Sequence, residues 1–338
     1  MQGFTIGIVS PALPGVNNGN GRTAQRWARL LASRFKVSVL SSWQGEPLDL
    51  LIALHARRSA ESIARWAAQR QCGGGGCRGS LIVVLTGTDL YRDIATDAAA
   101  RRSLELADTL VVLQDQGLLA LPEALRGKTR VIYQSGARRA TPEKTTKRLR
   151  VLTVGHLRDE KLPQTLQAAA RLLRNRPDIR IHHIGAALDP GLETAARNTA
   201  MRCPGYAWLG ARPHAQTMRW MQRAHVLVHP SRVEGGAHVV LEAVLGGTPV
   251  IASDIPGNRG MLGADYDGYF PVGDAAALAQ ALERSRDEPQ FLARLMRQCA
   301  RRAHLFEPLR EERALARLVR ETLDLQHTNL RQKRNSPR

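Results

Sequence analysis

The sequence is poor in aromatic side chains. Phe, Trp and Tyr are present five times each and together make up 4% of the 338 residues. Aliphatic side chains must therefore fill most of the interior, within a total of 43% hydrophobic residues. Proteins that bind single-stranded nucleic acid combine basic grooves with aromatic rings on which the bases stack. The scarcity of aromatics argues against nucleic acid as a partner.

Long apolar runs are also missing. No run reaches the roughly 18 residues that a membrane-spanning helix needs, and residues 1–10 indicate a short strand. That segment lacks the basic start and the long apolar stretch of a signal peptide. The first half shows no clear apolar patch of the kind that lies on a membrane. We expect a cytoplasmic protein with no membrane partner.

Cysteines are few and form no framework. The four are Cys72, Cys77, Cys203 and Cys299, a number that fits a reducing compartment. Cys72 and Cys77 bracket four glycines, but a zinc site needs about four ligands and no matching second pair exists. We expect no metal, and a loop between these two cysteines.

Acidic residues are outnumbered, with 30 against 49 basic residues and a net charge of +19. Three explanations remain open. The first is an arginine-rich surface with solvated helix faces, the second an attraction of anionic substrates, and the third nucleic-acid binding. The basic segment 327–338 is expected to be disordered.

Short apolar runs alternate with helical patterns along the chain, which predicts parallel sheets with right-handed crossovers. Residues 136–150 interrupt this rhythm because they are polar and basic and contain Pro142, as expected of a domain boundary. The sequence therefore predicts an α/β protein with two Rossmann-like domains facing across a cleft. We place them at residues 1–143 and 148–305, followed by a helix over 306–325 that can cross back to the first domain and a tail over 326–338. Ligands of such sheets lie at the carboxyl ends of the strands.

The most informative stretch is 231–254, in which seven residues separate Glu234 from Glu242. Gly235 and Gly236 stand at the expected start of a helix over 236–245. Free N–H groups and the helix dipole favour a phosphate there. We expect Glu234 to accept hydrogen bonds from the hydroxyls of a sugar and Glu242 from a ribose. The backbone of the intervening residues would line the same ligand, with Gly235, Gly236, Ala237, His238 and Val239 as donor-binding residues. Taken alone, the two glutamates are better explained as a capping residue and an exposed helix residue, but the adjacent Gly-Gly and the turn-strand-turn run over 246–257 favour the ligand site.

This stretch resembles the glutamate–seven–glutamate motif of the retaining family-four glycosyltransferases, which have the glycosyltransferase-B fold. The segment VGHLRDEK matches the family at Gly155, Leu157, Glu160 and Lys161 and departs from it at His156, where the family has Arg. The resemblance implies that Glu234 contacts the donor sugar, Glu242 the nucleotide ribose, and that Arg158 and Lys161 bind the diphosphate. Two cations after a strand suit that charge, although an exposed basic turn has the same sequence. The stretch 206–214 resembles the loop that holds the base, with Gly210 and Arg212 as candidates.

Three segments of the first domain follow predicted strands and are candidates for the acceptor site. The loop 10–23 is rich in Gly and Asn and can present N–H groups to an anion, or it is a surface loop. Next come His55 with two arginines, where a lone histidine is more often structural, and the run TGTDLYRD. The candidate acceptor-binding residues are Asn20, Gly21, Arg22, His55, Arg57, Arg58, Thr86, Thr88, Asp89 and Arg92. Many family members have a histidine where this sequence has Thr86.

Strings such as SPALPGVNNGNGRTAQRWARLL, LIALHARRSAESI, VVLTGTDLYRD and SRVEGGAHVVLEA resemble the selenosugar synthases of selenoneine biosynthesis. The resemblance implies a transferase that joins selenophosphate to the sugar of a UDP-sugar such as UDP-N-acetylglucosamine, with the anomeric configuration retained. The UDP-sugar would be a substrate, and no cofactor is implied. A functional link to a selenophosphate-producing enzyme follows. Selenium is already nucleophilic, which fits the threonine at position 86. The alternative is transfer of a sugar to a hydroxyl of a lipid or a saccharide.

Overall fold

A computed structural model describes residues 3–11, 19–71 and 79–335, without the side chains from 325 onward. The chain divides into two compact units. Unit 1 contains the described residues up to Gln134 and those from Pro308 on, and unit 2 contains Ser135–Glu307. Residues 135–143, which the sequence analysis gave to the first domain, therefore belong to unit 2. Cys72, Cys77 and Asn17 lie outside the described residues.

Unit 1 is built on a six-stranded parallel sheet of order β2-β1-β3-β4-β5-β6. Its strands are β1 (Thr5–Val9), β2 (Lys36–Leu40), β3 (Leu50–Leu54), β4 (Ser80–Leu85), β5 (Thr109–Val112) and β6 (Thr129–Val131). The central strands are buried on both faces and read as continuous apolar runs for that reason. In β3, Leu50, Ile52 and Leu54 enter one hydrophobic cluster, while Leu51 and Ala53 enter the other.

Helices cover both faces of this sheet. They are α1 (Gly19–Leu31), α2 (Ala60–Gln71), α3 (Ile94–Thr96), α4 (Ala98–Leu106), α5 (Gln116–Leu119), α6 (Glu123–Arg126) and α14 (Pro308–Asn335), with one π-helical turn, η1 (Asp89–Asp93). Helix α1 begins earlier than the sequence predicts. Asn20, Gly21 and Arg22, assigned above to a loop, lie in its first turn.

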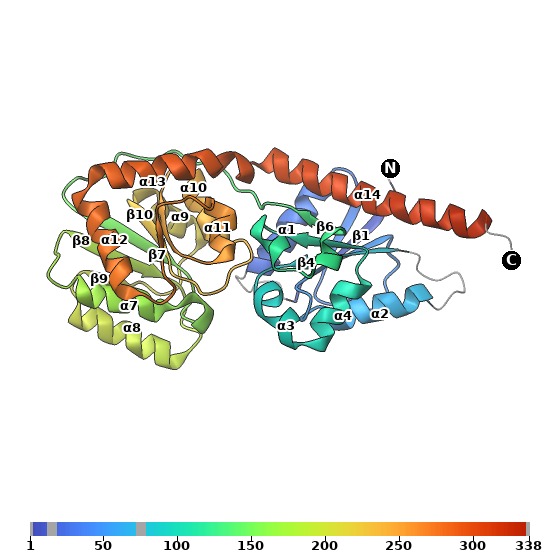
Figure 1. The fold of residues 1–338 in the computed structure, drawn as a ribbon, viewed down its shortest axis with the longest axis horizontal. Coiled ribbons are helices and arrows are strands. Elements are labelled where there is room, and N and C mark those ends of the chain that lie inside the picture. Colours follow the sequence, from blue (N-terminus) through green and yellow to red (C-terminus); the bar gives the residue numbers. More distant parts are fainter. Residues whose placement is uncertain (1–2, 12–18, 72–78, 336–338) are drawn as a thin grey trace. The chain divides into compact units, whose positions relative to one another are not determined.

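Helix α14 is part of unit 1 and lies beside α1 (Figure 1). Its residues Leu315, Leu318, Val319 and Leu323 belong to the same hydrophobic cluster as Trp27 of α1. The helix continues to Asn335, beyond the predicted end at 325. The apolar spacing that marks a helix fades after Leu323, but the polar residues that follow continue the same helix.

Unit 2 repeats the architecture with a parallel sheet of order β12-β11-β10-β7-β8-β9. The strands are β7 (Leu149–Val154), β8 (Ile179–Ile184), β9 (Tyr206–Trp208), β10 (Val226–His229), β11 (Val250–Ser253) and β12 (Tyr269–Phe270). The helices are α7 (Pro163–Leu172), α8 (Pro190–Arg202), α9 (His214–Arg223), α10 (His238–Leu245), α11 (Pro256–Leu262), α12 (Ala275–Asp287) and α13 (Pro289–Arg302), with short 3₁₀ turns η2 (Asp159–Lys161) and η3 (Ala303–Phe306). The prediction of two Rossmann-like α/β domains is confirmed.

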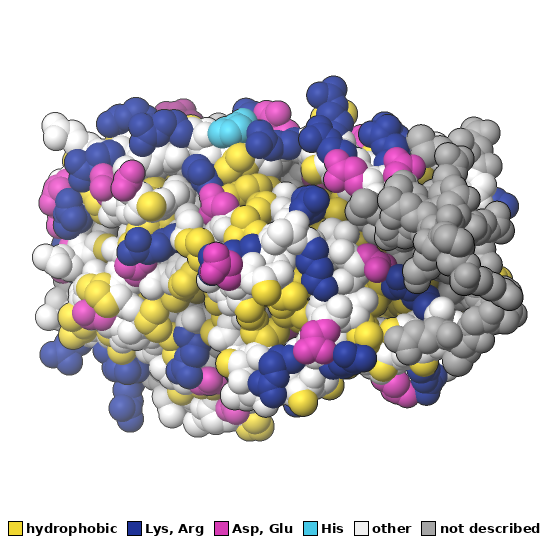
Figure 2. All heavy atoms as spheres, turned by 45° about the vertical axis from the view of Figure 1, so that its right-hand side comes forward, with side chains coloured by type: hydrophobic (Ala, Val, Ile, Leu, Met, Phe, Trp, Pro, Cys, Tyr) yellow, Lys and Arg dark blue, Asp and Glu magenta, His cyan; other side chains and the backbone are white. Residues whose placement is uncertain are grey.

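Basic side chains are dispersed over the surface. Figure 2 shows Lys and Arg spread over the visible face, with Asp and Glu side chains between them. That pattern favours the solvated arginine-rich surface among the three explanations for the net charge. Within the described ranges, no helix is both long enough and apolar enough to cross a membrane.

One buried carboxylate fixes helix α14 to α1. Glu311 is 1% exposed and accepts hydrogen bonds from Arg26 Nε at 3.0 Å and Trp27 Nε1 at 2.8 Å. Removing one partner of a buried ion pair leaves the other charge without compensation, which is strongly destabilising.

We expect Glu311→Ala to lower the free energy of unfolding by about 3 kcal/mol, measured by urea denaturation. The matched control is Glu312→Ala, since Glu312 pairs with Arg34 at 3.4 Å on the surface. Its loss should cost at most about 1 kcal/mol. Equal effects of the two variants would contradict the anchoring role of Glu311.

Candidate functional site

In unit 2, two charged side chains meet at the carboxyl ends of neighbouring strands. Strands β7 and β10 pair in parallel; Lys161 follows the first and Glu234 the second. Lys161 Nζ forms an ion pair with Glu234 Oε1. The loops are joined by the Arg232 amide, which donates to the Glu160 carbonyl at 2.9 Å. The topology thus places the predicted sugar-binding glutamate beside one of the two predicted diphosphate-binding cations.

A third group completes this cluster. His229, at the end of β10, is buried, and its Nε2 lies 3.2 Å from Glu234 Oε1. Burial is the main reason why the pKa of His229 is lowered, so the imidazole is neutral at pH 7. Nε2 therefore carries the hydrogen and donates it to the carboxylate. The sequence analysis missed His229; its position as a polar residue closing an apolar strand was the available signal.

The Glu234 carboxylate is held ionised. Burial by itself raises its pKa, but the charge of Lys161 and the hydrogen bond from His229 outweigh burial, and the pKa lies well below the ordinary value. Helix α11 also closes on this residue, because a Cβ atom on Gly257 would lie 2.1 Å from the Glu234 carbonyl oxygen. Only glycine permits that approach. The site therefore contains a fixed negative acceptor.

Glu242 lies on α10, with its side chain 12% exposed. Its Oε1 accepts a hydrogen bond from His214 Nε2 at 2.7 Å and is 3.5 Å from His238 Nε2. The helix begins at His238 with Ala237 as its N-cap, so Gly235 and Gly236 precede it, contrary to the predicted start at 236. Val239 lies in its first turn.

The remaining residues predicted to bind the donor make fewer contacts with the cluster around Glu234. The side chain of Arg158 is 43% exposed, and its Nε lies 3.9 Å from Glu160. Gly155 directly follows β7, and Lys161 passes beside it, since a Cβ there would meet Lys161 Cδ at 3.6 Å. Part of the predicted base-holding loop is strand β9. Gly210 follows this strand with a φ of +68° that favours glycine, and Arg212 is exposed.

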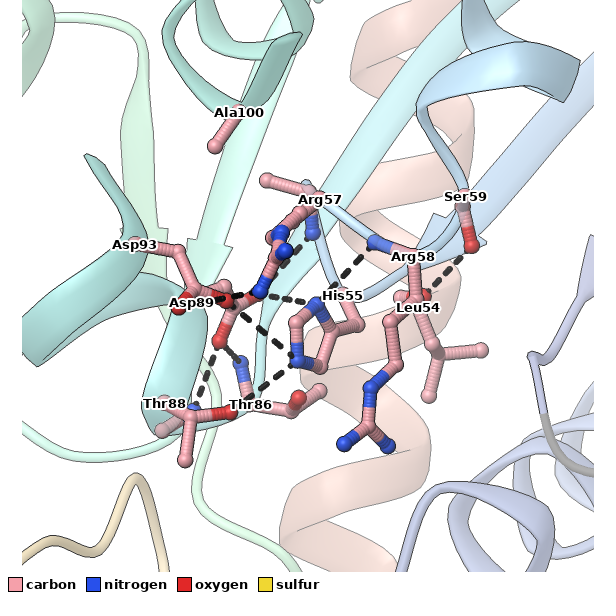
Figure 3. Close-up of polar contacts among 12 residues, drawn as sticks. Leu54, His55, Arg57, Arg58, Ser59, Thr86, Thr88, Asp89, Asp93 and Ala100 are labelled. Atoms are coloured by element: carbon pink, nitrogen blue, oxygen red, sulfur yellow. Dashed lines mark hydrogen bonds and ion pairs between the residues drawn. The ribbon is translucent and has the colours of Figure 1, made fainter. Parts of the chain in front are cut away.

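Unit 1 has its own polar cluster at the carboxyl ends of β3 and β4 (Figure 3). Asp89 lies at its centre and is fully buried. One carboxylate oxygen accepts from the amides of Thr86 and Gly87, both at 2.9 Å, and the other from the amide of Ala56 at 2.9 Å. These bonds give Asp89 a structural part in fastening the two loops together, and its predicted contact with an acceptor stays a prediction.

His55 occupies this cluster in a strained conformation. Its φ is +74°, in the left-handed region, which is rare outside glycine and clusters at functional sites. Its Nδ1 accepts the Arg58 amide at 3.3 Å, and Nε2 lies 3.0 Å from Thr88 Oγ1. Burial lowers the pKa of His55 most, although Asp89 opposes that effect. The ring is neutral and carries its hydrogen on Nε2.

The three arginines of this cluster differ in their partners. Arg57 Nε contacts Asp97 at 2.8 Å and Arg92 Nε contacts Asp93 at 3.0 Å. Arg58 is exposed, and no contact of its guanidinium with another described residue is recorded. Nothing in the sequence distinguishes these arginines, but in the structure Arg57 and Arg92 pair with carboxylates whereas Arg58 does not pair with any described one.

The ion pair of unit 2 supports a prediction about stability. In the wild type, the lowered pKa of Glu234 stabilises the fold above the unfolded pKa of about 4.3, and this contribution is lost as pH falls through the lowered value. In Lys161→Met, burial still raises the pKa of Glu234, and of the two groups that lower it only His229 remains. We expect a loss of about 2 kcal/mol at pH 7 in urea denaturation, and a smaller loss near pH 5.

The double variant Lys161→Met/Glu234→Gln is the control for that experiment, because it removes both charges. The double variant should lose less unfolding free energy than the two single variants lose together, by about 1 kcal/mol or more. Additive effects, or a loss that does not depend on pH, would count against the ion pair as the reason for the lowered pKa.

Comparison with known proteins places the chain in a family. The family model for glycosyl transferases group 1 matches residues 136–304, half of the chain. A D-inositol 3-phosphate glycosyltransferase from Streptomyces avermitilis is 31% identical over 170 residues, which are 46% of this chain and 36% of that relative. A glycogen synthase from Mycobacterium tuberculosis is 26% identical over 211 residues, 61% of this chain and 50% of that relative. The alignments thus span half or less of these relatives.

Solved structures agree on the fold. A sucrose-phosphate synthase from Thermosynechococcus elongatus has a TM-score of 0.74 at 18% identity, covering 94% of this chain and 98% of that one. The Anabaena protein HepE, in complex with UDP, has a TM-score of 0.72 at 16% identity, covering 94% and 100%. These likenesses show the two-unit architecture of glycosyltransferase-B proteins. The chain belongs to the glycosyl transferases group 1 family.

Proposed function

We propose that the protein transfers the sugar of a UDP-sugar to a small anionic acceptor, with retention of the anomeric configuration, and that this acceptor is selenophosphate. The observation that carries the donor half is the partly buried Glu234 carboxylate, kept ionised by Lys161 and His229 at the end of β10. A charged acceptor of hydrogen bonds in a fixed position suits the hydroxyls of a bound sugar.

The other donor residues follow from this placement. Glu242 is positioned by His214 and accepts from the ribose hydroxyls. Lys161, beside Glu234, is available to the departing diphosphate, whose charge a preorganised cation stabilises. The first turn of α10 supplies N–H groups to a phosphate. UDP as the nucleotide is supported by the HepE complexes with UDP and with UDP-glucose.

For the acceptor, the support is the resemblance of the unit 1 strings to selenosugar synthases, together with the exposed Arg58 that follows β3. The selenium atom would attack the anomeric carbon of the sugar. The C–Se bond forms, the C–O bond to UDP breaks, and the products are UDP and a glycosyl selenophosphate. Cleavage of its P–Se bond by water then gives phosphate and the selenosugar. Since selenophosphate is an anion, no protein base has to remove a proton from it.

A second candidate is transfer to a hydroxyl of a phosphorylated polyol. It is favoured by the name of several relatives, D-inositol 3-phosphate glycosyltransferase. Both candidates require binding of a phosphate-type anion but differ in the attacking atom. A hydroxyl must lose its proton, and a base is then needed.

The test is mass spectrometry of reactions that contain UDP-N-acetylglucosamine or UDP-glucose with either selenophosphate or inositol 3-phosphate. The proposal expects a selenium-containing sugar product in the first case, and the anomeric coupling constant in its NMR spectrum should be that of an α-linkage. Product from inositol 3-phosphate alone would favour the second candidate. A β-linked selenosugar would contradict retention.

We expect Glu234→Gln to lower kcat about 10- to 100-fold, because the neutral amide loses a charged hydrogen bond to the sugar. The matched control is Glu193→Gln, the same change on an exposed residue of α8 that pairs with Arg197. Both should bind UDP as the wild type does, as measured by calorimetry. Near-normal turnover of the Glu234 variant would remove this residue from the reaction.

We also propose that catalysis needs no metal ion, since a cation and a helix N-terminus can neutralise the diphosphate. Within the described residues, no group of three or more His, Cys, Asp or Glu side chains is arranged to hold one. Asp265 and Asp267 form a pair and not such a group, and Asp267 is engaged by Arg294 at 2.7 Å. Turnover should persist in EDTA; a loss that Mg²⁺ restores would refute this proposal.

A further inference from the structure

The polar cluster of unit 1 contains arginines that are already paired and one that is not. Arg57 contacts Asp97 at 2.8 Å and Asp93 at 3.9 Å, and Arg92 contacts Asp93 at 3.0 Å. Each of these two guanidiniums therefore has its charge compensated by a carboxylate of the same unit. They stabilise the segment 92–97 and add little net attraction for a ligand.

Arg58 is the exception. Its backbone amide is tied to His55 Nδ1 at 3.3 Å, which fixes where the side chain starts. Its guanidinium makes no recorded hydrogen bond or ion pair with another described residue, and the residue is exposed. Figure 3 shows Arg57 directed toward Asp89 and Asp93, whereas the Arg58 side chain is directed away from them. Among the described residues, Arg58 thus supplies a positive charge at the end of β3 that no carboxylate compensates.

Two hydroxyl groups at the end of β4 are free to donate. Because the neutral His55 donates from Nε2, Thr88 Oγ1 is the acceptor of that bond, and its own hydrogen needs another acceptor. In the part of the chain that the structure describes, none is recorded for it, nor a partner for the hydroxyl of Thr86. Both residues are partly exposed. Arg58 and these two threonines follow the carboxyl ends of the neighbouring strands β3 and β4, and among the described residues none of their three donor groups has an acceptor.

These donors stand on a rigid base. The Asp89 carboxylate joins the loop after β3 to the loop after β4 through the amides of Ala56, Thr86 and Gly87. His55, buried and with a φ of +74°, connects the backbone of Arg58 to the side chain of Thr88. Preorganised donors bind without the cost of ordering them first.

We propose that the Arg58 guanidinium and the hydroxyls of Thr86 and Thr88 form an oxyanion subsite that binds the phosphate-type group of the acceptor, and that Arg57 and Arg92 are not part of it. This deepens the proposed function and rests on it for the identity of the acceptor. An arginine fork suits the oxygens of a tetrahedral oxyanion, which accept hydrogen bonds and donate few or none.

The same arrangement disfavours a neutral sugar hydroxyl as the group bound here. A hydroxyl needs an acceptor as well as a donor, and the carboxylates nearby are occupied: Asp89 by backbone amides, Asp93 and Asp97 by arginines. The subsite thus selects for negative charge. His55 and Asp89 are positioning residues that act through Thr88 and the loops.

The test is calorimetric titration of the full-length protein with inorganic phosphate, in the presence of saturating UDP to occupy the diphosphate site of unit 2. We expect Arg58→Ala to weaken phosphate binding about 10- to 100-fold and Thr88→Val by a few-fold, since a charged hydrogen bond contributes more than a neutral one. Arg57→Ala and the surface control Arg102→Ala should stay within about twofold of the wild type. Circular dichroism verifies that each variant is folded.

Unchanged phosphate binding in Arg58→Ala overturns the subsite, as does a wild type that binds no phosphate, or an Arg57→Ala variant that loses as much affinity as Arg58→Ala. The failure of the proposed function is separate. If Arg58→Ala loses phosphate affinity while the wild type transfers no sugar to selenophosphate, the subsite stands and the acceptor assignment falls. If sugar is transferred and the KM for selenophosphate is unchanged in Arg58→Ala, the subsite falls and the function stands.

Discussion

Unit 2 is organised around a buried negative charge. A carboxylate largely removed from water is unfavourable unless cations and hydrogen bonds compensate it, and Glu234, whose side chain is 12% exposed, has both, from Lys161 and His229. This requirement brings the loop after β7 to the loop after β10, places a histidine at the end of a core strand, and admits only glycine at position 257 where α11 approaches. Lys161 and the loops that follow β7 and β10 are thus positioned by the electrostatics of one side chain.

Unit 1 also contains a buried carboxylate, but its charge is compensated in another way. Asp89 is also buried, but it is compensated by three backbone amides rather than by a cation, so it fixes loops and leaves the arginines to other carboxylates. The two buried acids look alike in the sequence, each following a strand and preceding a helix. Their partners differ: Glu234 pairs with a lysine and a histidine, whereas Asp89 fastens two loops through backbone amides.

The sequence was sufficient for the two parallel sheets, because buried central strands such as β3 must be continuous apolar runs. It could not separate Arg57 from Arg58. That difference depends on where η1 and α4 place Asp93 and Asp97, which adjacent residues in the sequence do not reveal. The helical character of residues 326–335 was missed for another reason, since helix α14 is anchored far upstream by Glu311 and its last turns carry no apolar pattern.

The protonation of Glu234 is the most direct test of this account. Carboxyl ¹³C NMR of glutamate-labelled protein, with Glu234→Gln to assign the signal, follows that one side chain through a pH titration. Compensation by Lys161 and His229 predicts that Glu234 stays ionised well below the pH of about 4.3 at which an unperturbed glutamate titrates. A midpoint at or above that value would mean that burial prevails, and the fixed negative charge on which the donor site is built would not exist.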